Sequence, residues 1–188
     1  LVMNRLILNF TAYFLIPLST VLFAWDSNWL TTNFSVLSNG MERKNAFAFW
    51  GLLVGVYFFC ILHQISRKMF PAPRGISLIS LSLLLLVCGV VTPYLPENLP
   101  FPSFLHVVFS FFAAVSLSVF LLLLLYQLSL RFPGEYRVYS WILAGILFLS
   151  AILLLLAGIV SSALEIFFTI SAAVFCRKLL EKVSMKNS

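Results

Sequence analysis

Charged residues are scarce in this 188-residue sequence, where Asp, Glu, Lys and Arg together make up only 10% of the chain. Apolar residues make up 62%, and the mean hydropathy is +1.06, whereas a soluble domain has roughly 45–50% apolar residues. So few charges cannot keep so apolar a surface in water. We therefore expect an integral membrane protein, with room for about six spans of roughly 20 residues each and for no separate soluble domain.

Patterns that bind metals or form disulfides are also missing. The three cysteines, Cys60, Cys88 and Cys176, lie inside apolar runs without a CxxC pair, and there are only two histidines. His63 and His106 are predicted near opposite membrane faces, about 25 Å apart in depth, so they cannot hold one ion. We expect no metal and no cofactor.

Established catalytic motifs are absent too. The sequence contains no GxSxG, HExxH, GxxxxGK[ST] or DxxxD pattern. The apolar runs also lack the regular series of buried charges that proton pumps and voltage sensors carry. A known class of hydrolase, a nucleotide-dependent enzyme and an ion pump are all disfavoured, and an enzyme of any kind is not the first expectation.

Six apolar runs predict six transmembrane helices in an all-α bundle. Pro17 lies within the first run and predicts a kink there. Prolines at 71, 73 and 93 forbid helix between later runs. The bundle forms a single domain over residues 3–188, with spans at about 6–25, 46–65, 76–92, 103–130, 138–160 and 163–180.

Basic residues predict the orientation of these spans. With the amino terminus inside, only Arg43 and Lys44 of the twelve basic residues lie on the outer side. Loops rich in Lys and Arg resist translocation, so we expect both termini in the cytoplasm. The pI near 9.5 then reflects topology, and we expect no nucleic-acid binding. The inner basic residues are Arg5, Arg67, Lys68, Arg74, Arg131, Arg137, Arg177, Lys178, Lys182 and Lys186. Of these, Arg177 and Lys178 can snorkel to the interface and extend the sixth helix.

Gly51 and Gly55 form a GxxxG spacing on the second predicted helix. Small residues at this spacing let two helix backbones approach closely in lipid. The neighbour can be a helix of the same chain, a partner protein or a second copy in a homo-oligomer. We favour the contact within the chain.

A few polar residues are expected together near the outer face. His106 and Ser110 share a face of the fourth helix, and an acidic residue close to hydrocarbon, such as Glu165, is a functional-site hypothesis. A structural alternative for Glu165 is a capping box with Ser162 at the start of the sixth helix. The candidate ligand-binding residues are His106, Ser110, Ser161, Ser162, Glu165 and, in the outer loop, Arg43.

The outer loop over residues 26–45 mixes polar and apolar residues. It can lie on the membrane as an amphipathic segment, fold back over the bundle as a lid, or simply connect two helices. Asn33, Phe34 and Ser35 in this loop also match the short glycosylation sequon.

The segment TTNFSVLSNGMERKNAFAFWGLLVGVYF, the pair His106 and Ser110, and the SSALE start of the sixth helix resemble the bacterial six-helix proteins of domain-of-unknown-function family 998. The resemblance spans nearly the whole chain, through short motifs. It implies a location in the bacterial cytoplasmic membrane and no particular reaction. The acidic or arginine-rich start expected on the last helix is represented only by Glu165.

Three functions follow from these features. The leading hypothesis is a protein that binds or moves a lipid or another amphipathic small molecule through an outward-facing pocket, because twenty phenylalanines supply a large apolar surface. The second is an intramembrane enzyme acting on lipid headgroups, with His106 as general base and Glu165 as its orienting partner or as an acid. The third is a structural or regulatory subunit whose Gly51 and Gly55 face docks a partner helix.

Overall fold

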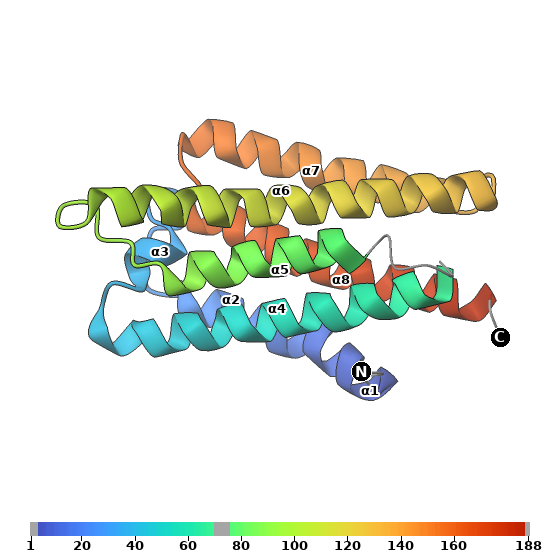
Figure 1. Cartoon of the computed structure of the whole chain (residues 1–188), viewed down its shortest axis with the longest axis horizontal. Helices are drawn as coiled ribbons and strands as arrows, with labels where there is room; N and C mark the ends of the chain where they lie inside the picture. The colour runs from blue at the N-terminus through green and yellow to red at the C-terminus, as the bar shows by residue number, and fades with distance from the viewer. Residues whose placement is uncertain (1–3, 70–75, 187–188) are drawn as a thin grey trace.

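The computed structural model describes residues 4–69 and 76–186, and these residues form helices and connecting loops without any strand (Figure 1). The all-α prediction is therefore confirmed for this part of the chain. The prolines predicted to break the chain at 71 and 73, and the basic residue at 74, lie outside the described residues. The elements are α1 (Arg5–Phe10), a π-helical segment η1 (Thr11–Leu15), α2 (Ile16–Phe23), α3 (Phe34–Leu37), α4 (Met41–Met69), α5 (Ile76–Val91), α6 (Pro100–Arg131), α7 (Arg137–Ala157) and α8 (Ser162–Lys186).

Among the described residues, four helical stretches are long and apolar enough to cross a membrane. α5 contributes a shorter apolar stretch, Ile79–Val91, and α8 carries several charges in its second half. These helices suit an integral membrane protein. The four stretches are Arg5–Phe23, Arg43–Lys68, Pro100–Arg131 and Arg137–Ala157.

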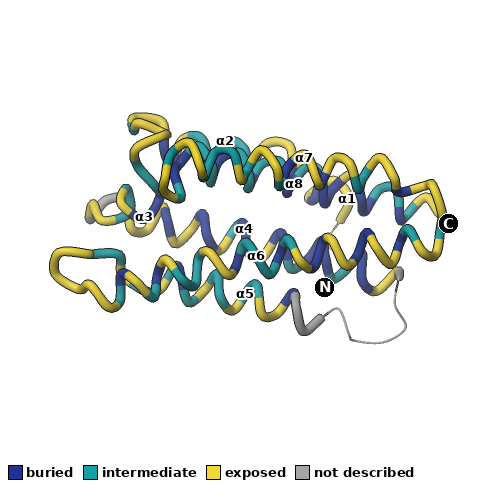
Figure 2. The backbone as a smooth tube through the Cα atoms, turned by 90° about the horizontal axis from the view of Figure 1, so that it is seen from above, coloured by how far each residue is buried: buried dark blue, intermediate teal, exposed yellow. Residues whose placement is uncertain are grey.

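The long helices lie side by side in two layers (Figure 2). α4, α5 and α6 form one layer, in which α5 packs against both neighbours; α2, α8 and α7 form the other, in which α8 is central. Contacts of α2 and α8 with α4, and of α6 with α7, join the layers. α1 begins and α8 ends towards the same end of the bundle, opposite α3 (Figure 1).

The first membrane-length helix is interrupted where the sequence predicts a kink. Pro17 has no backbone N–H and follows the π-helical segment, in which the Ile16 N–H bonds to the Thr11 carbonyl five residues earlier. A proline removes an α-helical hydrogen bond and crowds the preceding turn, and π-helical turns are a common way of accommodating such a disruption.

Other helix boundaries differ from the predicted spans by a few residues. α4 begins at Met41, so the polar residues before the predicted start at residue 46 are helical as well. α6 starts with Pro100 in its first turn, a position that needs no N–H donor. α7 ends at Ala157 and is capped by Gly158, whose φ of +69° suits a glycine cap. Polar helix ends were missed because the predicted spans followed apolar runs alone.

The two glycines of the GxxxG spacing face α5. A Cβ atom on Gly51 would lie 2.7 Å from a methyl group of Val90, and one on Gly55 would lie 3.0 Å from a methyl group of Leu83. Both glycines thus lie where α4 approaches α5 closely, within the chain.

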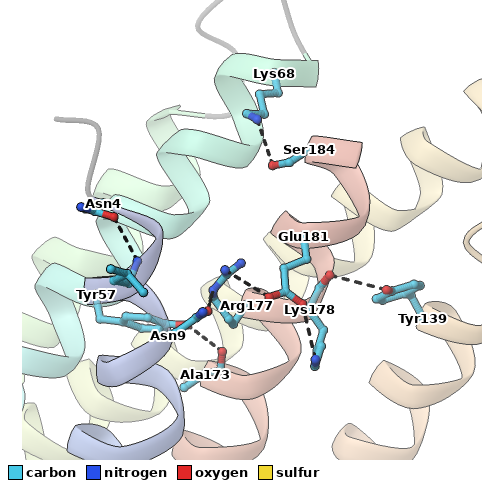
Figure 3. Close-up of polar contacts among 11 residues, drawn as sticks. Asn4, Asn9, Tyr57, Lys68, Tyr139, Ala173, Arg177, Lys178, Glu181 and Ser184 are labelled. Carbon is cyan, nitrogen blue, oxygen red and sulfur yellow. Dashed lines mark hydrogen bonds and ion pairs between the residues drawn. The ribbon is translucent and has the colours of Figure 1, made fainter. Parts of the chain in front are cut away.

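A charged network, which we call the Arg177 network, consists of Asn9, Arg177 and Glu181 and ties α1 to α8 (Figure 3). Arg177 Nε donates to Asn9 Oδ1 at 2.6 Å, and its guanidinium lies 3.1 Å from Glu181 Oε1. Arg177 is 2% exposed, so the prediction that it snorkels to the interface is wrong. A partner on the first helix, remote in sequence, holds it inside the bundle. Lys178 is exposed and pairs with Glu181 at 3.4 Å.

Candidate functional site

The loop between α2 and α4 folds back onto the start of α8. The carbonyl oxygens of Thr32 and Trp29 accept hydrogen bonds from the Ser162 and Ala163 N–H groups at 2.7 and 2.8 Å. These N–H groups have no partner within their own helix, so the loop satisfies donors that a helix start leaves open. Of the three alternatives for this loop, the structure has the one that returns to the bundle.

This loop contact replaces the capping box predicted for Ser162 and Glu165, which is wrong. The side chain that caps α8 is Ser161, whose Oγ accepts from the Leu164 N–H at 3.4 Å. Glu165 turns to the loop instead, where its Oε2 accepts from the Phe34 N–H at 2.7 Å. The backbone donor of Ser162 is already used by Thr32, so Glu165 is left for another partner.

Phe34 fixes the loop in place. Its ring is fully buried and lies 5.0 Å from the ring of Phe23 and 4.9 Å from that of Trp50, centroid to centroid. Trp50 in turn donates from Nε1 to Thr20 Oγ1 at 2.9 Å. Edge and tilted ring contacts of this kind favour one arrangement, and they set the position of the residue that follows Phe34.

That residue, Ser35, meets His106 of α6. Ser35 Oγ lies 2.5 Å from His106 Nε2, and His106 Nδ1 lies 2.8 Å from the carbonyl oxygen of Thr92. A carbonyl oxygen only accepts, so Nδ1 carries a hydrogen; in the neutral ring Nε2 is then the acceptor, and the Ser35 hydroxyl donates to it. Both Ser35 and His106 are buried. The Ser35 hydroxyl thus donates to a histidine whose ring is oriented by the Thr92 carbonyl on its other side.

Two further polar residues border this pair. Asn33 precedes α3 and accepts the Val36 N–H on Oδ1 at 2.8 Å, as an N-cap residue does. Glu165 holds the Phe34 N–H, one residue from Ser35. We call Asn33, Ser35, Thr92, His106 and Glu165 the α3-end cluster.

The α3-end cluster lies at a cavity of about 470 Å³ between the two layers of helices. Asn33, Ser35, His106 and Glu165 all line it. The rest of its wall is mainly apolar and comes from α4, α5, α6, α7 and α8, for example from Trp50, Leu86, Phe111, Leu154 and Phe168. Ligand pockets have volumes of roughly 300–1,000 Å³ and combine apolar walls with a few polar groups, so this cavity can hold a small molecule or part of a lipid.

The structure brings together only some of the predicted ligand-binding residues. His106, Ser110 and Glu165 line the cavity. Ser161 and Ser162 are buried at the start of α8 and do not line the cavity. Arg43 forms a surface ion pair with Asp26 and does not line it either. The second histidine, His63, stacks on Phe59 at 5.8 Å and is likewise outside the lining.

The sequence did not predict the pairing of Ser35 with His106. The two residues are 71 positions apart, and Ser35 stood among many polar residues of the outer loop. The enzyme hypothesis gave Glu165 the role of orienting His106 or of acting as an acid, but the two ring nitrogens of His106 contact Ser35 and the Thr92 carbonyl. An aromatic residue between two hydrogen-bonding residues, as in NFS, was the available signal that this loop enters the bundle.

Within residues 4–69 and 76–186, no group of three or more His, Cys, Asp or Glu side chains could hold a metal ion. Comparisons of the chain with protein families, with curated proteins and with solved structures found no match. The resemblance to family 998 therefore stays a prediction, and the function has to be argued from the site itself.

Proposed function

We propose that this protein binds a lipid or another amphipathic small molecule in the cavity between its two helix layers, with the polar part of the ligand at the α3-end cluster. The observation that supports this most is the asymmetry of the cavity wall. Hydrogen-bonding side chains gather where Ser35, His106 and Glu165 lie, whereas most other lining residues are apolar. A molecule with one polar end and an apolar remainder matches such a wall.

The polar part of the ligand carries little or no negative charge where it meets the cluster. Among the described residues that line the cavity there is one carboxylate, Glu165, and no Lys or Arg. A phosphate held in so apolar a place would need a cationic partner. An ester, amide or hydroxyl group finds hydrogen-bond donors and acceptors there instead.

We also propose six membrane crossings with both termini in the cytoplasm. α5 and α8 run alongside the four helices of membrane length (Figure 1), and α1 begins and α8 ends towards one end of the bundle. Basic residues at the start of α1 and α7 and the end of α4, α6 and α8 belong to that same end, as the preference of Lys and Arg for the cytoplasm requires. The α3-end cluster then lies towards the outer leaflet. The resemblance to family 998 adds a bacterial cytoplasmic membrane as the expected location.

Mass spectrometry of the purified protein tests the binding proposal. After extraction in mild detergent, we expect one class of amphipathic molecule to copurify in a fixed molar ratio to the chain. Ala114→Phe adds a ring on a residue that lines the cavity and should lower this ratio, because the ring takes the space of the ligand.

Ala144→Phe on α7 is the matched control. It makes the same change at an exposed residue outside the cavity lining and should leave the ratio unchanged. If no molecule is enriched in the wild-type protein, or if both variants retain it equally, the cavity is not the binding site.

A further inference from the structure

The α3-end cluster pairs a serine hydroxyl with a histidine in a way that most serines of this chain do not. Ser116, Ser118 and Ser150 each donate to a backbone carbonyl three or four residues earlier, the usual way of satisfying a hydroxyl inside a helix. Ser35 donates instead to His106 Nε2, a nitrogen basic enough to take up the hydroxyl proton. A serine next to a histidine base, with the base oriented by a third group, is the arrangement of an activated nucleophile.

We propose that Ser35 is a nucleophile and His106 its general base, and that the protein cleaves a carboxylic ester of an amphipathic molecule held in the cavity. This rests on the proposed function, because the ligand bound there is the substrate. The Thr92 carbonyl, 2.8 Å from Nδ1, positions the ring. It takes the place that an acidic side chain has in the serine protease triad.

The cavity selects the kind of substrate. Ser35 and His106 are buried but line the cavity, so the reacting carbonyl has to enter from that side. The apolar wall beyond them accommodates an acyl chain, and the absence of Lys and Arg from the described lining residues favours a neutral carbonyl over a phosphate as the group attacked. In a membrane lipid, the ester group lies at the boundary between the chains and the headgroup, as this substrate requires.

The reaction needs no redox partner and no group other than water. The Ser35 proton passes to His106 Nε2 while Oγ forms a bond to the ester carbonyl carbon, whose π electrons move to the carbonyl oxygen. When these electrons return, the bond from carbon to the alcohol oxygen breaks and His106 gives the proton to that oxygen. Water then attacks the acyl-serine with His106 as base, which releases the carboxylic acid and restores the serine. Asn33 lies two residues from Ser35 and lines the cavity; its amide group is suited to donate to the developing oxyanion.

An alkyl fluorophosphonate tests the proposal on the full chain in phosphatidylcholine nanodiscs. This probe forms a covalent bond from phosphorus to an activated serine oxygen and releases fluoride, with the proton passing to the base. We expect mass spectrometry to place the adduct on Ser35. His106→Gln keeps a hydrogen-bonding side chain and should slow labelling about a hundredfold or more, which is the range of general-base catalysis.

Two variants show that the label reports this serine alone. Ser35→Ala should abolish labelling, and Ser116→Ala, on α6 outside the cavity lining, should leave it unchanged. If Ser35→Ala fails to fold, Ser35→Cys keeps a side chain of similar size and must also lose the phosphonate adduct.

A purely structural hydrogen bond would give a different result. If folded wild-type protein shows no adduct on Ser35 at a probe concentration that displaces its copurified ligand, or if His106→Gln is labelled as fast as the wild type, the nucleophile assignment is wrong while the binding proposal stands. If no ligand copurifies but Ser35 is labelled, Ser35 is an activated nucleophile, while the binding proposal fails and the ester substrate fails with it. One preparation of the protein therefore tests the two proposals separately.

Discussion

The two polar regions of this bundle satisfy their buried polar side chains in different ways. In the Arg177 network, a buried guanidinium is paired with Asn9 and Glu181, and none of the three residues lines the cavity. The α3-end cluster contains no positive charge when His106 is neutral. Four of its five residues border the cavity.

We interpret this difference as one between a structural region and a candidate functional region. A buried charge without a partner is very costly, so the Arg177 network serves to satisfy Arg177 and to hold α1 against α8. The α3-end cluster satisfies its own groups as well, yet Ser35 and His106 also form part of the cavity wall. Changes in the first region should therefore affect stability, and changes in the second should affect ligand and chemistry.

The largest effect is expected for Phe34→Ala. Removing a fully buried ring costs roughly 3–5 kcal/mol in a protein core, and here the loss falls on the contact of α3 with Phe23 and Trp50. The loop should detach, so that hydrogen exchange of residues 26–40 rises and copurified ligand falls. Val36→Ala, at an exposed residue of the same short helix, is the control. Equal exchange in both variants would mean that Phe34 is not the anchor.

Arg177→Ala should destabilise the protein without reducing ligand binding. We expect a loss of about 3 kcal/mol, at the lower end of the range for breaking a buried ion pair, because the partner Glu181 is partly exposed. Unfolding in mixed detergent micelles measures this loss. Lys178→Ala removes an exposed partner of the same carboxylate and should cost at most about 1 kcal/mol. A drop in ligand ratio for Arg177→Ala at a temperature where it is folded would contradict the division between the two regions.

Glu165 should act through the loop backbone. Glu165→Ala leaves the Phe34 N–H without its acceptor, and a buried donor left unsatisfied costs about 1–3 kcal/mol. Glu165→Gln keeps an acceptor oxygen and should retain most of the stability. Exchange of the amides in residues 29–37 reports the difference, and similar exchange in the two variants would show that this hydrogen bond does not hold the loop.

The smallest effect concerns the surface pair of Asp26 and Arg43, also at the α3 end. The hydrogen bond from Arg43 holds the pKa of the Asp26 carboxyl below its ordinary value of 3.8. Folding therefore favours the ionised form, so the contribution is present above that value and is lost as pH falls through the lower pKa of the folded state. Stability measured from neutral pH downwards should fall slightly less for Asp26→Asn than for the wild type. An identical fall would mean that the pair does not contribute.

The sequence predicted an all-α chain correctly for the described residues, because long apolar runs leave few alternatives; four of the six expected spans are helical stretches of membrane length. Three of the predicted residues, His106, Ser110 and Glu165, line the cavity, and they were found because polar residues are conspicuous inside apolar runs. The sequence could not predict contacts between distant segments of the chain. The partners of Arg177 and His106 lie 168 and 71 residues away, and no local pattern announces them.

The capping box shows how a local pattern can mislead. Ser162 and Glu165 have the right spacing, but the returning loop supplies Thr32 and Trp29 as acceptors for the same helix start. Tertiary contacts overrode a motif that was plausible by itself, and Glu165 accepts from the Phe34 N–H at the cavity instead.

We propose that the cavity holds the apolar part of a ligand whose polar end reaches Ser35 and His106. Photo-crosslinking tests it most directly, with a phosphatidylcholine that carries a diazirine in its acyl chain, incorporated into vesicles with the full chain. We predict adducts on cavity-lining residues such as Leu86, Val90 and Phe111, reduced by Ala114→Phe. Adducts confined to residues on the outer surface such as Leu155 and Leu156, and unchanged by Ala114→Phe, would contradict the account.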